Sequence, residues 1–237
     1  MTSSNALQAV VFDCDGILVD TEPLHYQAFQ EVLKPLGLGF DYDRYLDRYI
    51  GFDDRDAFRE AFREGERALE PGALDQLMID KAESLLRLVE RGVKSFPGVV
   101  ELVRELSAKG IPLAVASGAL RHEVLLFVNA LGLGDAFPVV VAADDVARSK
   151  PDPETYRLAV RRLSAFGSCD DLAPGSCVAI EDTVTGIQSA RRAGLVVLGV
   201  ANSYPADELR PHADCVVESL DQVGADKLSR LVETAKR

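Results

Sequence analysis

Five short runs of apolar, mostly β-branched residues, each followed by a helical pattern, indicate the fold class of this chain. The runs are AVVFD at 9–13, IPLAVAS at 111–117, PVVVA at 138–142, SCVAIED at 176–182 and LVVLGV at 195–200. Strands that are apolar throughout are typical of parallel sheets covered on both faces. The sequence therefore predicts an α/β fold with a doubly wound, Rossmann-like parallel sheet.

One long segment interrupts this alternation. Residues 21–92 carry apolar side chains at three- and four-residue steps and contain no convincing strand. The breaks in the helical pattern are Lys34-Pro35, Gly51 and Pro71-Gly72. The segment departs from the carboxyl end of the first strand, where open α/β sheets bind ligands. We therefore expect a core formed by residues 1–20 and 93–237, with an α-helical cap at 21–92 that acts as a lid; the alternative is that these helices extend the core.

The charge of the chain limits its partners. Its 38 acidic and 26 basic residues give a formal net charge of −12, without a long basic block, which disfavours nucleic acid and anionic membrane surfaces. Apolar runs such as 195–201 are far shorter than the roughly 20 residues of a membrane span, and the first residues lack the pattern of a secretory signal. We expect a cytoplasmic protein that binds a small anion, with a monomer as the default oligomeric state.

The end of the first run carries Asp13-Cys14-Asp15-Gly16. Two carboxylates leave a backbone that must turn sharply, and Gly16 permits both the turn and the close approach of a ligand. Acid-x-acid pairs also occur as helix caps or on solvated surfaces, so the pair is informative only together with other strand ends. We interpret Cys14 as a packing residue, because two neighbouring aspartates raise the pKa of a thiol.

The second and third runs end in groups that suit an anion. Ser117-Gly118 supplies a hydroxyl and backbone N–H groups ahead of a helical segment, although a serine there could also be a simple N-cap. After the third run, the prolines of SKPDP fix Lys150 near the start of a helix expected at about Glu154. The alternative for Lys150 is an exposed surface lysine.

The fourth run ends in Glu181-Asp182, at the start of a helix that Gly194 closes. Such acids could merely offset the helix dipole. Together with Asp13 and Asp15, however, they supply the oxygen ligands that a hard divalent ion prefers. Mg²⁺ is favoured over zinc, because the chain has only three histidines and no Cys/His cluster with ligand spacing.

These groups predict phosphoryl transfer. Lys150 and the metal would neutralise a phosphate among the carboxylates, where each close charge pair is worth several kcal/mol at an effective dielectric constant of about 20. Asp13 would then attack phosphorus and form an aspartyl-phosphate. Asp15 would act as the general acid and then as the general base.

Four segments carry a family resemblance: FDCDGILVDTEPLH, ASG, SKPDP and IEDTVTGIQSARRAG. In this order they resemble the four signature motifs of the haloacid dehalogenase superfamily, across nearly the whole chain. The helical insert resembles the small cap of the group that contains β-phosphoglucomutase and many sugar-phosphate phosphatases.

The resemblance implies roles for the matching residues. They are Asp13 as nucleophile, Asp15 as acid/base that also offers its backbone carbonyl to the metal, Ser117 and Lys150 on the phosphate, and Asp182 with Glu181 in the Mg²⁺ site. Dehalogenases of the superfamily lack the second aspartate, so Asp15 favours phosphoryl chemistry.

The cap contributes less specific matches. Thr21 and His25 correspond to positions that sense substrate in β-phosphoglucomutase, although His25 could equally be a partly buried cap residue. Lys81 either faces the site or is a solvated helix lysine. The arginine that the mutase uses is replaced by Asp54, with Arg55 one step later, which counts against mutase activity.

The sequence thus predicts a Mg²⁺-dependent phosphatase of a small phosphorylated metabolite, with a sugar phosphate as the favoured substrate. The substrate-binding residues would be Gly16, Thr21, His25, Lys81 and Gly118. The alternative is a phosphomutase of the β-phosphoglucomutase type. A non-catalytic binding protein is disfavoured, because every residue that the chemistry needs is present.

Overall fold

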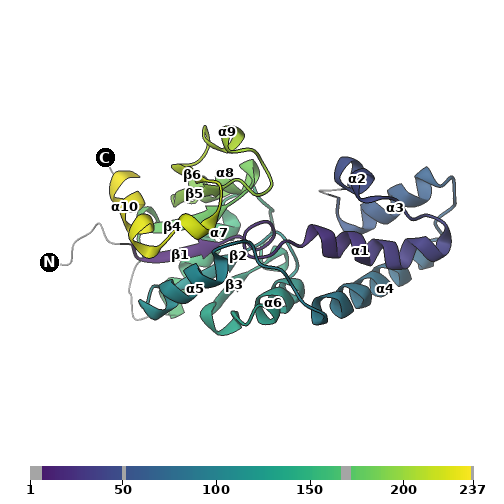
Figure 1. Ribbon diagram of the computed structural model, residues 1–237, viewed down its shortest axis with the longest axis horizontal. Coiled ribbons are helices and arrows are strands. Elements are labelled where there is room, and N and C mark those ends of the chain that lie inside the picture. The colour runs from purple at the N-terminus through teal and green to yellow at the C-terminus, as the bar shows by residue number, and fades with distance from the viewer. Residues whose placement is uncertain (1–6, 50–51, 167–171, 236–237) are drawn as a thin grey trace. The chain divides into compact units, whose positions relative to one another are not determined.

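The computed structural model describes residues 7–49, 52–166 and 172–235 (Figure 1). Two compact units make up the chain: Met1–Asp20 with Lys94–Arg237, and Thr21–Val93. Gly51, expected as a helix break, lies outside the described residues.

The first unit is built on a six-stranded sheet in the order β3-β2-β1-β4-β5-β6, in which every neighbouring pair is parallel. Its strands are β1 (Ala9–Phe12), β2 (Leu113–Ala116), β3 (Val139–Val141), β4 (Cys177–Glu181), β5 (Val196–Val200) and β6 (Cys215–Val217). The predicted fold class is confirmed, and the first five strands lie within the predicted runs. The sixth strand was not predicted, because it lies at the edge of the sheet and two of its three residues are only half-buried, so its apolar run is shorter than that around β3.

Helices connect these strands and cover both faces of the sheet. They are α5 (Val99–Ala108), α6 (Arg121–Ala130), α7 (Glu154–Phe166), α8 (Val184–Arg192), α9 (Ala206–Leu209) and α10 (Ala225–Ala235), with 3-10 turns at Gly134–Ala136, Ala143–Asp145, Pro174–Ser176 and Leu220–Gln222. Ala9 and Val11 of β1 belong to one apolar cluster with residues of α7 and α8. Val10 and Phe12, which point to the opposite face, are equally buried. Burial on both faces explains why these strands are apolar throughout.

The order of the strands reverses at β1. Strand β2 pairs with one edge of β1, and β4 pairs with the other, so β1 and β4 form the topological switch point where such sheets bind ligands. Phe12 lies opposite Ile180 in this pairing, and the Asp13 N–H donates to the Ile180 carbonyl at 3.0 Å. The residues that follow, Asp13 and Glu181, are therefore brought to the same edge of the sheet.

Helices are the only regular secondary structure among the described residues of the second unit, and loops join them. It contains α1 (Glu22–Leu33), a 3-10 turn (Lys34–Leu36), α2 (Tyr42–Arg44), a π-helical turn (Tyr45–Tyr49), α3 (Asp54–Glu64) and α4 (Pro71–Glu90). The break predicted at Pro71-Gly72 lies where α4 begins, and Pro71 is the first residue of that helix, as suits a proline that has no N–H to donate. Phe29, Leu33, Phe58 and Leu77 belong to the apolar core of this unit.

No helix among the described residues combines the length and apolar character that crossing a membrane requires.

Candidate active site

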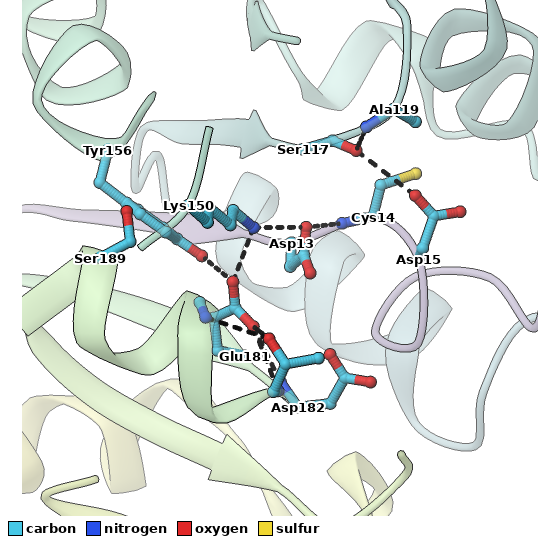
Figure 2. Close-up of polar contacts among 12 residues, drawn as sticks. Asp13, Cys14, Asp15, Ser117, Ala119, Lys150, Tyr156, Glu181, Asp182 and Ser189 are labelled. Atoms are coloured by element: carbon cyan, nitrogen blue, oxygen red, sulfur yellow. Dashed lines mark hydrogen bonds and ion pairs between the residues drawn. The ribbon is translucent and has the colours of Figure 1, made fainter. Parts of the chain in front are cut away.

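The Asp13 carboxylate lies at the carboxyl end of β1 and is fixed by two donors (Figure 2). Its Oδ1 accepts hydrogen bonds from the Cys14 N–H and from Lys150 Nζ, both at 2.8 Å. Asp13 is only 7% exposed, which excludes a solvated acid-x-acid pair at this position. Burial raises the pKa of Asp13, the charge of Glu181 raises it further, and Lys150 opposes both effects.

Lys150 bridges two strand ends. Its ammonium lies 2.8 Å from Asp13 Oδ1 and 2.6 Å from Glu181 Oε1, with a side chain that is only 11% exposed. Burial alone would lower the pKa of Lys150, but the charges of Asp13 and Glu181 raise it above its ordinary value. The ammonium therefore stays charged, and the exposed-lysine alternative is wrong.

The Glu181 carboxylate is saturated with donors. Oε1 accepts from Lys150 Nζ and from the Tyr156 hydroxyl at 2.8 Å. Oε2 accepts from the Asp182 N–H at 3.1 Å and from the backbone and hydroxyl of Thr183 at 3.3 and 3.2 Å. Gly186 on α8 allows this arrangement, because a Cβ there would lie 1.9 Å from Oε1. Glu181 is completely buried, so these donors compensate its desolvation.

One carboxylate oxygen of Asp182 accepts no hydrogen bond among the described residues. Its Oδ2 accepts a hydrogen bond from Ser203, whereas its Oδ1 is buried without a partner among the described residues. Burial raises the pKa of Asp182 to about 7, and the neighbouring Glu181 contributes in the same direction. Gly16 makes this packing possible, because a Cβ at Gly16 would lie 1.9 Å from Asp182 Oδ2.

These carboxylates suit a divalent cation. One ligand oxygen each of Asp13, Glu181 and Asp182 lies within 4.8 Å of the others. The unpartnered Asp182 Oδ1 and the raised pKa of both aspartates mark a place where positive charge would be strongly stabilising. The donors on Glu181 leave Asp13 and Asp182 as the better placed ligands. The Asp15 side chain is not in this group, so any contribution of Asp15 to a metal falls to its backbone carbonyl, which stays a prediction.

Asp15 and Ser117 form a second polar pair. The Ser117 hydroxyl donates to Asp15 Oδ2 at 3.4 Å and accepts from the Ala119 N–H at 2.9 Å. The N-cap of α6 is Leu120, so the interpretation of Ser117 as an N-cap is wrong. Gly118 is exposed between these residues, and a Cβ there would meet nothing within 4 Å.

Cys14 is fully buried between the two aspartates. Burial raises the pKa of the Cys14 thiol, and the charges of Asp15 and Asp13 raise it further. The thiol therefore stays protonated, which supports its interpretation as a packing residue.

Three predicted substrate residues lie in the helical unit. Thr21 is the N-cap of α1, and its carbonyl accepts from the His25 N–H at 3.0 Å. Lys81 is only 1% exposed, so the solvated-lysine alternative is wrong. Its ammonium donates to His25 Nδ1 and to Asp54 Oδ1, each at 2.8 Å, and lies 5.2 Å from the centre of the Phe29 ring. Burial, assisted by the charge of Lys81, lowers the pKa of His25 to about 3.

Several residues of the site were not predicted. Ser203 contacts Asp182, and Asn202 Nδ2 donates to the Gly16 carbonyl at 2.7 Å. Both residues follow the carboxyl end of β5, where polar side chains are expected near a ligand, so the position of Asn202 and Ser203 in the sequence could have indicated them. Tyr156 lies within the helix α7, where a single tyrosine in an amphipathic pattern gives no such signal.

Residues 10–200 match the family model of haloacid dehalogenase-like hydrolases. This range contains Asp13, Ser117, Lys150, Glu181 and Asp182 but not Asn202 or Ser203. The chain belongs to the haloacid dehalogenase-like hydrolase family. The predicted family and its hydrolase class are thereby confirmed, so this chain is an enzyme.

Relatives of this haloacid dehalogenase-like hydrolase are similar over most of their length. Protein CbbY of Rhodobacter capsulatus is 33% identical, with 95% of this chain and 99% of the relative covered. Fructose-1-phosphate phosphatase YqaB of Escherichia coli is 33% identical over 81% of this chain and 95% of its own. A CbbY variant from Rhodobacter sphaeroides, solved in complex with xylulose-1,5-bisphosphate, is 30% identical with a TM-score of 0.76, over 92% of this chain and 96% of that chain.

Proposed function

We propose that this haloacid dehalogenase-like hydrolase is a Mg²⁺-dependent phosphatase of sugar phosphates that works through an aspartyl-phosphate on Asp13. The observation that carries the proposal is the position of Lys150, whose ammonium bridges Asp13 and Glu181 at the switch point of the sheet. A fixed cation beside a carboxylate nucleophile is what the transfer of an anionic phosphoryl group requires.

In this mechanism Asp13 attacks phosphorus in line with the leaving oxygen. The new bond joins an Asp13 oxygen to phosphorus, and the bond from phosphorus to the sugar oxygen breaks. Asp15 gives its proton to the departing alkoxide. The hydroxyl of Ser117, which contacts Asp15, and the ammonium of Lys150 hold the phosphoryl oxygens.

The second half of the reaction releases phosphate. Asp15, now ionised, takes a proton from a water molecule, and that water attacks phosphorus and returns Asp13 as a free carboxylate. Proton uptake and release by Asp15 thus balance over one turnover. Asp15 suits this exchange because it is partly exposed, whereas Asp13 is buried.

Asp13 and Asp182 are the residues that would hold Mg²⁺, together with the backbone carbonyl of Asp15. When bound, Mg²⁺ supplies positive charge that offsets the repulsion between the phosphate and the carboxylates. Glu181 serves mainly to hold Lys150, because five donors already occupy its two oxygens.

Two relatives support a sugar phosphate as the substrate class. One is a fructose-1-phosphate phosphatase, and the other was solved with xylulose-1,5-bisphosphate. We also propose that the helical unit acts as the predicted lid and supplies Thr21, His25 and Lys81 to substrate binding, and that the enzyme acts in the cytoplasm.

A phosphomutase is the weaker alternative. Asp54, at the position where the mutase has its arginine, is paired with Lys81 at 2.8 Å. Arg55 is 52% exposed and lies 3.4 Å from Asp75, also on the surface. A mutase would have to bind the second phosphate of a bisphosphate, and this pairing offers no free guanidinium for it.

The test is a screen of hexose, pentose and ketose phosphates with Mg²⁺, in which released phosphate is measured. Asp13→Asn should retain the fold but accumulate no phosphoenzyme in rapid-quench labelling, whereas Asp15→Asn should be phosphorylated slowly. Isomerisation that needs a bisphosphate primer, with little phosphate release, would establish the mutase instead. Full activity of both variants would overturn the mechanism, and no turnover of any ester would favour a binding protein.

A further inference from the structure

Tyr156 is a buried polar side chain that the mechanism above does not use. It lies in the first turn of α7 and is completely buried. Its hydroxyl donates to Glu181 Oε1 at 2.8 Å, and its ring centre lies 5.1 Å from Lys150 Nζ. Tyr156 therefore contacts both partners of the Lys150–Glu181 ion pair (Figure 2).

The Lys150 ammonium contacts two carboxylates, those of Asp13 and Glu181, at the same time. Its ammonium is 2.6 Å from Glu181 Oε1 and 2.8 Å from Asp13 Oδ1. In a buried site the ammonium moves toward whichever oxygen carries more uncompensated charge, because electrostatic forces are poorly screened there. If Glu181 competed too well, Lys150 would be drawn away from the nucleophile and from the phosphoryl group.

The Tyr156 hydroxyl reduces this competition. It donates to Oε1, the same oxygen of Glu181 that Lys150 contacts, so part of the negative charge of that oxygen is already compensated. Thr183 and the Asp182 N–H compensate the other oxygen. The face of the Tyr156 ring also lies within cation–π range of the ammonium.

We propose that Tyr156 is a positioning residue for phosphoryl transfer, which keeps Lys150 balanced between Glu181 and Asp13 by donating to Glu181 Oε1. The inference rests on the function proposed above and extends it to a residue outside the signature motifs. Tyr156 acts only through its two neighbours and does not touch the substrate.

The decisive variant is Tyr156→Phe, which keeps the ring and removes only the hydroxyl. Losing one hydrogen bond to a charged group should lower kcat about 10-fold to 100-fold, because Lys150 then stabilises the transferring phosphoryl group less well. KM should change less than about 2-fold, since the substrate contacts themselves remain.

Tyr49→Phe is the matched control. Tyr49 is 2% exposed, and its hydroxyl donates to Glu64 Oε2 at 2.8 Å within the helical unit. The substitution removes a hydrogen bond from a buried tyrosine to a partly buried glutamate, in a unit that contains neither Lys150 nor Glu181. We expect kcat to remain unchanged in this variant.

A double-mutant cycle separates positioning from a structural role. In a Lys150→Met background, adding Tyr156→Phe should lower the residual kcat no further, because the residue through which Tyr156 acts is gone. An equal reduction in both backgrounds would show that the tyrosine merely supports the fold, and would overturn the inference. So would a Tyr156→Phe enzyme with wild-type kcat. A wild-type enzyme that releases no phosphate from any ester would overturn the proposed function, and the inference with it.

Discussion

Lys150 Nζ lies 2.8 Å from Asp13 Oδ1, although 137 positions separate the two residues in the chain. The contact joins the end of β1 to the turn that precedes α7. It keeps an ammonium beside a carboxylate in a place from which solvent is almost excluded, since the two side chains are 11% and 10% exposed. A buried carboxylate without this cation would tend to take up a proton and lose its nucleophilicity.

Replacing Lys150 by methionine should therefore affect both rate and stability. We expect kcat/KM to fall about 100-fold to 1,000-fold, as when one donor to a developing anion is lost. The free energy of unfolding at neutral pH should fall by about 3 kcal/mol, because Asp13 and Glu181 would remain buried without their cation. Steady-state kinetics and urea unfolding measure the two effects.

Lys109→Met is the control for this substitution. Lys109 also contacts two acids, Glu105 at 3.0 Å and Asp226 at 3.5 Å, but its side chain is 46% exposed. Surface pairs of this kind contribute about 0 to 1 kcal/mol, so stability and rate should hardly change. Equal effects of both substitutions would show that Lys150 has no special place in the site.

The sheet and the strand-end residues of the site could be predicted because each rests on a local pattern. The apolar runs mark the strands, and a parallel sheet brings their carboxyl ends to one edge, so Asp13, Ser117 and Glu181 could be grouped without coordinates. Lys150 was harder, because apart from the family resemblance of SKPDP only the prolines around it suggested that it was held in place.

Other features depend on packing that sequence patterns do not encode. Tyr156 gives no signal in the sequence of α7, because its partner Glu181 lies on a different strand. Lys81 has the ordinary spacing of a helix surface residue, yet it is buried because His25 and Asp54 from other helices complete its hydrogen bonds. The strand β6 is an edge strand with two half-buried residues, so it lacks the longer apolar run that marked the equally short β3.

Gly16→Ala should damage the proposed metal site through Asp182. Gly16 has φ +77°, and a Cβ would lie 1.9 Å from Asp182 Oδ2 and 3.0 Å from Ser203 Oγ. Because Asp182 must move, we expect the Mg²⁺ concentration for half-maximal activity to rise about 10-fold to 100-fold. Gly132→Ala is the control, since Gly132 has φ +67° with nothing within 4 Å. It should show only the backbone cost of about 1 to 2 kcal/mol in unfolding, and no change in Mg²⁺ dependence.

Asp182→Asn should have opposite effects on stability with and without metal. In metal-free protein at pH 8 the variant should unfold at a higher temperature than the wild type, because the substitution removes a buried charge whose Oδ1 has no partner in the described part of the chain. Adding Mg²⁺ should raise the melting temperature of the wild type, by binding to the folded state alone, but not that of the variant. Asp135→Asn, at an exposed position, should behave as the wild type. A variant that Mg²⁺ stabilises as strongly as the wild type would exclude Asp182 as a ligand.

His25 should make the helical unit sensitive to acid. Burial, together with the charge of Lys81, lowers the pKa of His25 from 6.5 to about 3, so the folded protein keeps the ring neutral where the unfolded chain binds a proton. The contribution of His25 to the free energy of unfolding is therefore fully present above pH 6.5 and is lost as the pH falls toward 3. Between pH 7 and pH 4 the loss attributable to His25 should reach at most about 3 kcal/mol.

The measurement is urea unfolding of the wild type and of His25→Asn at several pH values. The variant has no titrating ring at this position, so its free energy of unfolding should fall less steeply between pH 7 and pH 4. His122→Asn, which removes an exposed histidine of α6, should leave the wild-type slope unchanged. If His25→Asn keeps the full slope, then His25 takes up a proton in the folded state, and the contact from Lys81 Nζ to His25 Nδ1 does not persist in solution.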